Sequence, residues 1–473
     1  EKFIKFCEAE NIKAVEVAKV TDSGRMQMFW NGQKIVDLSR AFLDTSGCAK
    51  KQDAKITHLQ EISSNSIEFN EENFYKILAD KNTASQKGLV EMFDSTVGAT
   101  TVALPFGGKY QTTETEGCVQ TLPILNAENI ETVSYASWGF DAEISKQNSM
   151  VGASLAVVES VAKIVAMGGN FRNIRLSFQE YFEKLGNQPE KWGKPLASLL
   201  GAYDAQMNLG LAAIGGKDSM SGTYQDINVP PTLISFACAD GKKLNTISPE
   251  FKKAGNFIYH FHHQLQENGL PNYEVLIEIF DYIYQQIQQK KIVSVKTIKD
   301  GGVAVAVAKM SFGNLLGAAI SIDEKLLLEK NIGGLIIEST EKLDSDLLQQ
   351  IGEVKNLESL KINNLDFEIK KILEVNSRTF ENLFPTKEKE RIQINFDENL
   401  NGTEKKSINI ISHKIGAPRV FAPIFPGTNC EYETQNAFRK EGALVDSLPL
   451  KNLTHQLLDE SIEAWVEKIK QSQ

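Results

Sequence analysis

A stretch rich in glycine, hydroxyl and charged residues, 215–222, has the residue types best suited to holding an anion. Glycine lets backbone N–H groups approach a phosphate closely, lysine supplies a positive charge, and serine hydroxyls supply hydrogen-bond donors. The spacing differs from the GxxxxGK[ST] pattern of a Walker A loop. The simpler alternative is a tight polar turn between a helix and a strand. The candidate phosphate-contacting residues are Gly215, Gly216, Lys217, Asp218 and Ser219.

Two further sets of residues have the chemistry to contact a metal or a nucleotide. Glu159 and Lys163 lie four residues apart on an expected helix, where the simpler interpretation is an i,i+4 ion pair worth about 0.2–0.5 kcal/mol. Asp300 and the two glycines after it would present backbone amides at a helix start to an anion. As a bare tripeptide this motif is weak.

The histidines and cysteines are less informative. His260, His262 and His263 fall at one expected strand end, where His260 and His262 share a face. No third ligand lies nearby in the sequence, so a solvated or packed pair is favoured over a metal site. Cys430 is a candidate nucleophile because a helix N-terminus lowers the pKa of a thiol, but no histidine lies close to it in the sequence.

Composition limits the classes of partner. Of 473 residues, 42% are hydrophobic and 24% charged, which is typical of a globular chain with about three domains. The net charge of −10 offers no counterion-release term for binding nucleic acid. Five scattered cysteines favour a reducing, cytoplasmic compartment over a disulfide framework. No apolar run approaches the ~20 residues that span a bilayer, so no membrane partner is expected.

The spacing of apolar residues predicts two α/β blocks that would position these candidates. In the block 87–240, a helix over 149–168 has Ser149 as its N-cap, and a second helix begins at Pro195. That second helix carries large apolar residues on one side, namely Leu196, Leu199, Leu200, Tyr203 and Met207. In the block 241–383, the run 303–312 is too short to distinguish helix from strand. The other elements expected there are strands at 256–261, 292–298, 316–322 and 335–339, and a helix at 273–289.

The two ends of the chain look incomplete. Residues 1–49 are too few to bury a core alone, and 418–473 read as a single βαβ unit, which does not make a stable sheet. The polar stretches 50–86 and 384–417 look like linkers. The sequence therefore predicts a piece of a longer polypeptide.

Several motifs, in order along the chain, resemble phosphoribosylformylglycinamidine synthase in its large single-chain form, a ligase of purine biosynthesis. Asp94 to Gly98 looks like the family's Asp-Arg-Ser-Val motif, and 300–302 looks like its Ser-Asp-Gly-Gly motif. Residues 417–443 resemble the start of its glutaminase domain. The other matching stretches are 137–140, 157–163, 178–186, 192–196 and 215–222.

The resemblance implies an α/β fold of two tandem aminoimidazole-ribonucleotide-synthetase-like domain pairs followed by a flavodoxin-like class I glutaminase domain. The family converts formylglycinamide ribonucleotide, ATP and glutamine into formylglycinamidine ribonucleotide, ADP, phosphate and glutamate, using Mg²⁺. The implied layout is the end of the first pair at 1–49, a linker at 50–86, the second pair at 87–240 and 241–383, a linker at 384–417, and the truncated glutaminase at 418–473. Contacts with the missing first pair and the rest of the glutaminase are expected.

The resemblance also implies the roles of particular residues. Nucleotide or substrate binding falls to Asp94, Glu159, 215–219, Asp300 and Gly301, whereas the catalytic histidine falls before Glu1, outside this chain. Relatives hold an auxiliary ADP with Mg²⁺ in the second pair, and Glu159 matches one of the metal ligands.

The sequence departs from the family pattern at this expected metal site. Lys163 replaces a family Asn, and 296–299 replace His-Asp-Arg-Ser, so that Thr297 stands for a ligand Asp and Lys299 for the Ser. A lysine brings its own positive charge to a place where a cation would sit. Tight binding of Mg²⁺ and ADP in the family's manner is therefore not expected.

Two alternatives to a catalytic half remain open. A different synthetase of the same superfamily, for aminoimidazole ribonucleotide or selenophosphate, would lack the glutaminase-like unit after Pro418. A non-catalytic scaffold would brace the active half and dock the glutaminase. As part of the ligase, the chain alone is expected to be inactive, because the resemblance places the catalytic histidine in the first pair. Cys430 is not expected to be the glutaminase nucleophile, because that thiol sits on a glycine-flanked strand-to-helix turn deep in the family's domain.

Overall fold

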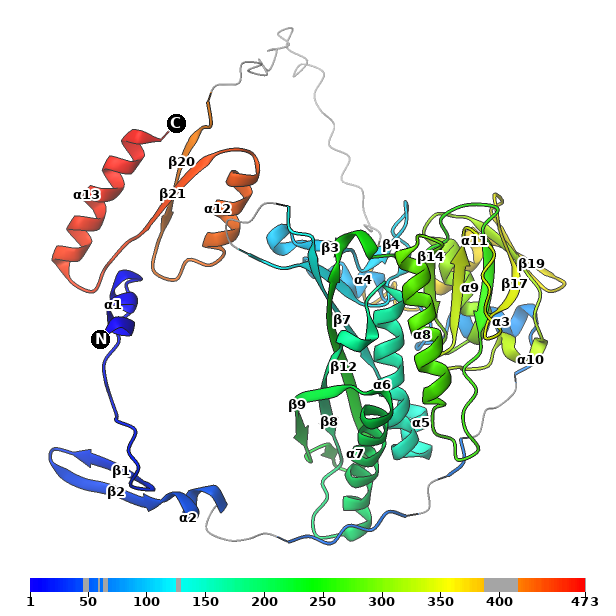
Figure 1. Cartoon of the computed structure of the whole chain (residues 1–473), viewed down its shortest axis with the longest axis horizontal. Coiled ribbons are helices and arrows are strands. Elements are labelled where there is room, and N and C mark those ends of the chain that lie inside the picture. The colour runs from blue at the N-terminus through cyan, green and yellow to red at the C-terminus, as the bar shows by residue number, and fades with distance from the viewer. Residues whose placement is uncertain (46–50, 58–59, 63–66, 125–128, 387–415, 473) are drawn as a thin grey trace. The chain divides into compact units, whose positions relative to one another are not determined.

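The computed structural model describes residues 1–45, 51–57, 60–62, 67–124, 129–386 and 416–472 (Figure 1). These residues form two units. The larger contains the described residues from Asp53 to 386, and the smaller contains those at the two ends of the chain.

The first domain of the larger unit is a six-stranded sheet in the order β3-β6-β7-β12-β8-β9. Its strands pair antiparallel except β8 and β9, which are parallel. Burial along β7 alternates with a period of two, as expected for a sheet with helices on one face. The strands are β3 (Thr101–Ala103), β6 (Cys118–Thr121), β7 (Thr132–Gly139), β8 (Arg175–Tyr181), β9 (Ala212–Ser219) and β12 (Thr232–Lys242).

Helix α6 (Ser149–Ala166) is the central element of this domain and confirms the expected helix. Its N-cap is Asn148, whose side chain accepts a hydrogen bond from the N–H of Val151, so the expectation of Ser149 as the cap is wrong. The helix is long and apolar enough to span a bilayer by length and composition, yet 94% of it is buried inside the protein. It packs on β7 and β12 of its own sheet and on a strand of the second domain, β14 (Ile292–Thr297).

Helix α7 (Pro189–Leu209) begins earlier than expected, so that Pro195 lies inside it and Pro189 occupies the first turn. Its small residues face α6; at Gly201 a Cβ would lie 2.0 Å from the carbonyl oxygen of Met150. The large apolar side is therefore turned outward. Its exposed residues are Leu196, Leu199, Leu200, Tyr203 and Met207.

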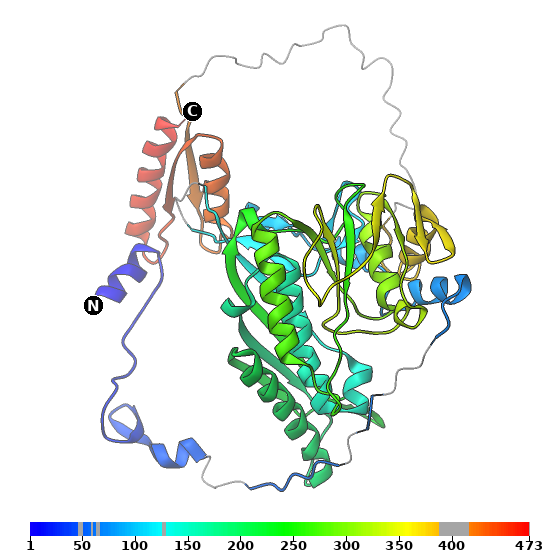
Figure 2. The ribbon, with the colours of Figure 1, turned by 45° about the vertical axis from the view of Figure 1, so that its right-hand side comes forward.

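The second domain is a seven-stranded sheet in the order β14-β16-β13-β17-β15-β18-β19. Most of this domain is drawn in green to yellow in Figure 2. The four expected strands are confirmed, and the undecided run 303–312 is helix α9 (Gly302–Phe312). The strands besides β14 are β13 (Phe257–Phe261), β15 (Gly317–Ile320), β16 (Leu335–Ser339), β17 (Gln349–Lys355), β18 (Ser359–Ile362) and β19 (Leu365–Glu368). The other long helices are α3 (Glu71–Leu78), α8 (Tyr273–Gln288) and α11 (Ile369–Ser377).

Part of the stretch expected to be a linker, 50–86, is folded into this second domain. The Phe74 ring of α3 lies 4.8 Å from the ring of Phe367, measured between centroids, and both residues are buried in the core beneath α9 and α11. Polar composition suggested a linker, but the buried ring of Phe74 fixes the segment against Phe367 in the core of the second domain.

One apolar cluster extends through both domains, because α6 lies between the two sheets. It includes Val158 of α6, Ile283 of α8 and Phe261 of β13. The domains therefore pack against each other as one unit.

The smaller unit contains a hairpin and a separate βαβ unit. The hairpin strands, β1 (Arg25–Trp30) and β2 (Gln33–Ser39), bury none of their side chains. The expected βαβ unit is present as parallel β20 (Arg419–Ile424) and β21 (Leu444–Pro449) around α12 (Glu431–Lys440), followed by α13 (His455–Gln471). The remaining elements are α1 (Lys2–Ala9), α2 (Arg40–Thr45), α4 (Lys87–Val90), α5 (Ala142–Gln147), α10 (Glu324–Leu327), β4 (Phe106–Gly107), β5 (Thr113–Glu114), β10 (Thr223–Tyr224) and β11 (Ile227–Asn228).

Candidate functional site

The candidate site is a cleft of about 360 Å³ between the two domains of the larger unit. Its first-domain wall includes Glu114, Glu116 and Trp138. Its second-domain wall comprises the end of β14 and the start of α9, including Lys299 and Gly302. Residues almost two hundred positions apart in the sequence therefore meet here.

Glu159 enters this region from α6 and is only 1% exposed. Its Oε2 accepts a hydrogen bond from the N–H of Phe140 at 3.1 Å. Its Oε1 lies 2.7 Å from the Nζ atoms of both Lys163 and Lys299, at angles that make these contacts ionic rather than directed hydrogen bonds. The predicted i,i+4 pair with Lys163 is confirmed, and the contact with Lys299 adds a second cation from the other domain.

Glu116 repeats this arrangement nearby. Its Oε1 lies 2.6 Å from Lys296 Nζ, and its Oε2 accepts a hydrogen bond from the Thr297 hydroxyl. Burial by itself raises the pKa of a carboxyl group, but the ammonium groups of Lys296 and Lys163 outweigh it and hold the pKa of Glu116 below its ordinary value. The carboxylate therefore stays ionised.

Two further lysines of the second domain pair with carboxylates of the first. Lys309 Nζ lies 2.6 Å from Glu114, and Lys330 contacts Asp141. Lys330 also lies 2.8 Å from Asp300 of its own domain. Counting Lys163, Lys296 and Lys299, five lysines are paired with five carboxylates, so the formal charges in and around the cleft cancel.

The side chain of Trp138 covers two of these cations. The Nζ atoms of Lys163 and Lys299 lie 4.6 and 5.4 Å from its ring centroid, within the range of cation–π attraction. Lys163 Nζ also donates a hydrogen bond to the Trp138 carbonyl oxygen at 2.8 Å. The tryptophan thus helps to hold both ammonium groups beside Glu159.

The donor set of the cleft does not fit the Mg²⁺ that the resemblance implies. Mg²⁺ requires octahedral oxygen ligands, usually free carboxylates and waters. Both oxygens of Glu159 and both oxygens of Glu116 already contact N–H, ammonium or hydroxyl groups of this chain. A divalent cation at Glu159 would also face two ammonium charges at close range.

The Asp300 motif lies in the cleft, and α9 begins there at Gly302, as the sequence predicted. Gly301 adopts φ +81° as the residue before α9, and a Cβ there would lie 2.2 Å from a methyl group of Val305, so this position requires glycine. Asp300 itself is ion-paired with Lys330. The structure therefore brings together Glu159, Asp300 and Gly301 from the predicted set.

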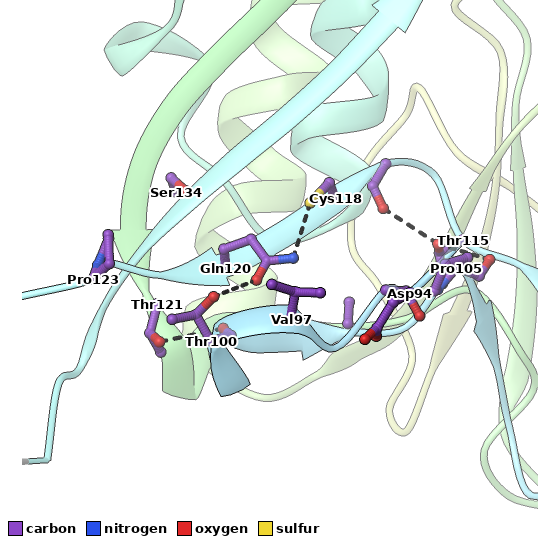
Figure 3. Close-up of a pocket in the computed structure, with 13 residues that line it drawn as sticks. Asp94, Val97, Thr100, Pro105, Thr115, Cys118, Gln120, Thr121, Pro123 and Ser134 are labelled. Carbon is purple, nitrogen blue, oxygen red and sulfur yellow. Dashed lines mark hydrogen bonds between the residues drawn. The ribbon is translucent and has the colours of Figure 1, made fainter. Parts of the chain in front are cut away.

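Asp94 lies in an adjoining pocket of about 680 Å³ at the β3 edge of the sheet (Figure 3). Its carboxylate accepts hydrogen bonds from the N–H and hydroxyl of Thr96, and the backbone bond is the larger cause of a lowered pKa. Pro105, Thr115 and Gly117 line both this pocket and the cleft. Asp94 is thus a neighbour of the cleft rather than part of its ion-pair network.

The expected phosphate loop is not a loop. Residues 215–219 belong to β9, an exposed strand at the opposite edge of the sheet from β3. Three strand spacings of about 4.8 Å separate β9 from β7, which carries Trp138, so this segment does not reach the cleft. Gly215, Gly216, Lys217 and Asp218 instead line a separate groove of about 490 Å³ beside α7.

The groove holds a carboxyl group of a different kind. Burial raises the pKa of Glu180 to about 7, and the charge of Asp218 adds to the shift. Glu180 Oε1 is buried without a hydrogen-bond partner. No ion pair to Glu180 occurs among the described residues.

The histidines are packed, as the sequence favoured. His260 is 2% exposed, and its ring lies 5.9 Å from that of His262, measured between centroids. Burial lowers the pKa of His260 and of His263 to about 4. Cys430 is exposed and adopts a left-handed φ of +61° at the start of α12.

The sequence did not single out Glu114, Asp141, Lys309 or Lys330 for the cleft. Their partners lie between 189 and 195 residues away, so no local spacing links them. Only the packing of α9 and of the segment before β16 against the first domain reveals these pairs.

Known proteins similar to this chain are PurL subunits of phosphoribosylformylglycinamidine synthase. The subunit of Campylobacter jejuni strain RM1221 is 20% identical over 365 residues, covering 71% of this chain and 48% of the relative. That of Sulfurimonas denitrificans is 22% identical over 414 residues, covering 80% of this chain and 54% of the relative. The chain spans about half the length of the curated relatives it matches. No protein-family model matches it.

The solved structures point to the same fold. T. maritima PurL complexed with ADP superposes with a TM-score of 0.50 at 14% identity, covering 65% of this chain and 52% of the other. At this identity the likeness shows the fold alone. The expected α/β fold is thus confirmed for the larger unit, whose two main sheets are mixed.

Proposed function

We propose that this chain is part of a phosphoribosylformylglycinamidine synthase, a ligase of purine biosynthesis, in which it supplies one synthetase half. The observation that carries this proposal is similarity to PurL subunits extending over 365 to 414 residues, together with a shared fold of two packed α/β domains. On this proposal 87–240 and 241–383 are the second domain pair, and 418–473 begin a glutaminase domain.

The substrates of the whole enzyme would be formylglycinamide ribonucleotide, ATP and glutamine, with Mg²⁺ required by the active half. The pocket at Asp94, together with the helix start at Gly301, would meet substrate or nucleotide. The groove at 215–219 would contact the first half, because the edge strand and the outward apolar side of α7 are exposed among the described residues of this unit. No residue of the chain is assigned to the chemical step.

A non-catalytic scaffold is the second candidate, and the ion-pair network favours it. A cleft whose carboxylates are all paired and whose charges cancel has lost the means to hold a metal-bound nucleotide. The half would then brace its partner domains rather than bind substrate.

Ligand binding to the 473-residue chain separates the two candidates. Calorimetry with formylglycinamide ribonucleotide and, separately, with ATP should show binding to a functional half and none to a scaffold. Asp94→Ala should weaken substrate binding, whereas Asp366→Ala, at an exposed position of the second domain, is the matched control and should not. With formylglycinamide ribonucleotide, ATP, Mg²⁺ and ammonia the chain alone should form no amidine; turnover above a blank would contradict the assignment of catalysis to another half.

Cys430 can be tested on the same chain. An electrophilic glutamine analogue should label it no faster than the exposed Cys118 and Cys238, because the described residues place no base beside it. Selective labelling of Cys430, located by mass spectrometry, would make it the nucleophile.

A further inference from the structure

We propose that lysines of the second domain take the place of a divalent cation in the cleft, forming a clasp of ion pairs that joins the two domains without metal. The clasp is defined by the pairs Lys296–Glu116, Lys299–Glu159, Lys309–Glu114 and Lys330–Asp141. The inference goes beyond the proposed ligase activity and does not depend on it.

The pairs have a consistent direction. In all four, the carboxylate belongs to the first domain and the lysine to the second. Outside the cleft, the more exposed interdomain pair Arg172–Asp281 runs the opposite way, with the cation on the first domain, so the shared direction is a feature of the cleft. One wall of the cleft is acidic and the facing wall supplies lysines. These lysines neutralise the carboxylates, as a bridging metal ion would do between two acidic walls.

Burial gives these contacts weight. The side chains of Glu116 and Glu159 are each 2% exposed and that of Lys296 is 9% exposed, whereas that of Lys299 is 32% exposed. Removing one partner of such a pair leaves an uncompensated charge in a low-dielectric site, which is strongly destabilising. The pair Lys370–Glu358, by contrast, is more than half exposed and contributes little.

The position of Lys299 explains why a divalent cation would be repelled at Glu159. Its Nζ and that of Lys163 both lie 2.7 Å from Glu159 Oε1, and both lie over the ring of Trp138. This carboxylate therefore already has two positive charges at contact distance. Adding Mg²⁺ there would require displacing at least one lysine from a site that burial and the ring hold in place.

The first experiment uses the unmodified chain. Its melting temperature, recorded in EDTA and in millimolar MgCl₂, should be the same within error, and calorimetry with MgCl₂, with and without ADP, should show no cation-dependent binding. A rise in melting temperature with Mg²⁺, or ADP binding that requires Mg²⁺, would overturn the proposal. Neither readout involves the ligase substrate, so the result is independent of the function proposed above.

The second experiment removes a cation. Lys296→Gln should lower the melting temperature by about 5 °C or more, because it leaves the buried carboxylate of Glu116 without the ammonium group that contacts it, whereas Lys296→Arg should retain most of the stability. Lys370→Gln, in the exposed pair of the second domain, is the matched control and should shift it by about 1 °C or less. A Lys296→Gln variant as stable as this control would overturn the proposal.

A double-mutant cycle covers the case in which a single variant fails to fold. Lys296→Met and Glu116→Gln each leave an unpaired buried charge, but together they leave none, so the double variant should melt higher than either single variant. Losses that simply add would show that the two side chains do not form a pair, which contradicts the clasp.

Discussion

Carboxyl groups have opposite pKa shifts in the cleft between the domains and in the groove beside α7. In the cleft, burial would raise the pKa of Glu116, but lysine charges hold it below the ordinary value. In the groove, the pKa of Glu180 rises to about 7, because burial acts together with the negative charge of Asp218. The difference lies in the second domain, which packs against the cleft and delivers counter-charges there.

The largest expected effect tests the cleft side of this comparison. Glu159→Ala would leave the ammonium groups of Lys163 and Lys299 facing each other in a buried site, and should reduce the free energy of unfolding by about 3–5 kcal/mol. Urea unfolding of the variant measures this loss. Glu358→Ala, at the exposed pair, should cost less than about 1 kcal/mol; equal losses would remove the distinction between buried and exposed pairs.

The buried histidines differ from both carboxyl groups, because they are neutral at pH 7 and so avoid burying a charge. The pKa of His260 and of His263 is about 4 in the fold, against 6.5 in the unfolded chain. Protonation therefore favours unfolding: stability is complete above pH 6.5 and is lost as the pH falls towards 4, by about 3 kcal/mol for each histidine. Unfolding free energies between pH 7 and 4 measure the slope. His260→Phe should reduce it, and an unchanged slope would contradict the burial argument.

A smaller effect is expected in the groove. Because the pKa of Glu180 is about 7 in the fold and 4.5 in the unfolded chain, its ionisation opposes folding, and stability falls as the pH rises from 4.5 through 7. Glu180→Gln should remove this dependence and stabilise the chain at pH 8 by about 1 kcal/mol, after allowance for solvent screening. Destabilisation at that pH would mean that an ion pair outside the described contacts serves Glu180.

The smallest effect concerns the outward side of α7. Tyr203 is 59% exposed, so Tyr203→Ser should change the unfolding free energy of the chain by about 0.5 kcal/mol or less. On the inward side, Gly201→Ala would place a methyl group 2.0 Å from the Met150 carbonyl oxygen and should cost about 1–3 kcal/mol. A large loss from Tyr203→Ser would show that the apolar side is covered within this chain.

Much of the fold was predictable from local sequence. Helix α6, the βαβ unit and most strands of the second domain follow from the spacing of apolar residues and from capping and turn residues, which act within a few positions of one another. The Glu159–Lys163 pair belongs to this class, because a helix brings residues four apart together whatever surrounds it. Strand alternation predicted in the same way that His260 and His262 share a face, whereas the choice between a solvated and a packed pair depended on the burial of His260.

Packing between distant segments decided the rest. The glycines at 215–216 suit a turn or an edge strand equally well, and only pairing with β8 made the segment a strand. The spacing of apolar residues on α7 predicted a side with large apolar side chains. Because α6 lies so close that only small residues fit between the two helices, the large apolar side faces outward. The ion pairs of the cleft depend on packing in the same way. Glu116 and Lys296 are 180 residues apart, and their charges attract each other strongly only because the two domains bury them at contact distance.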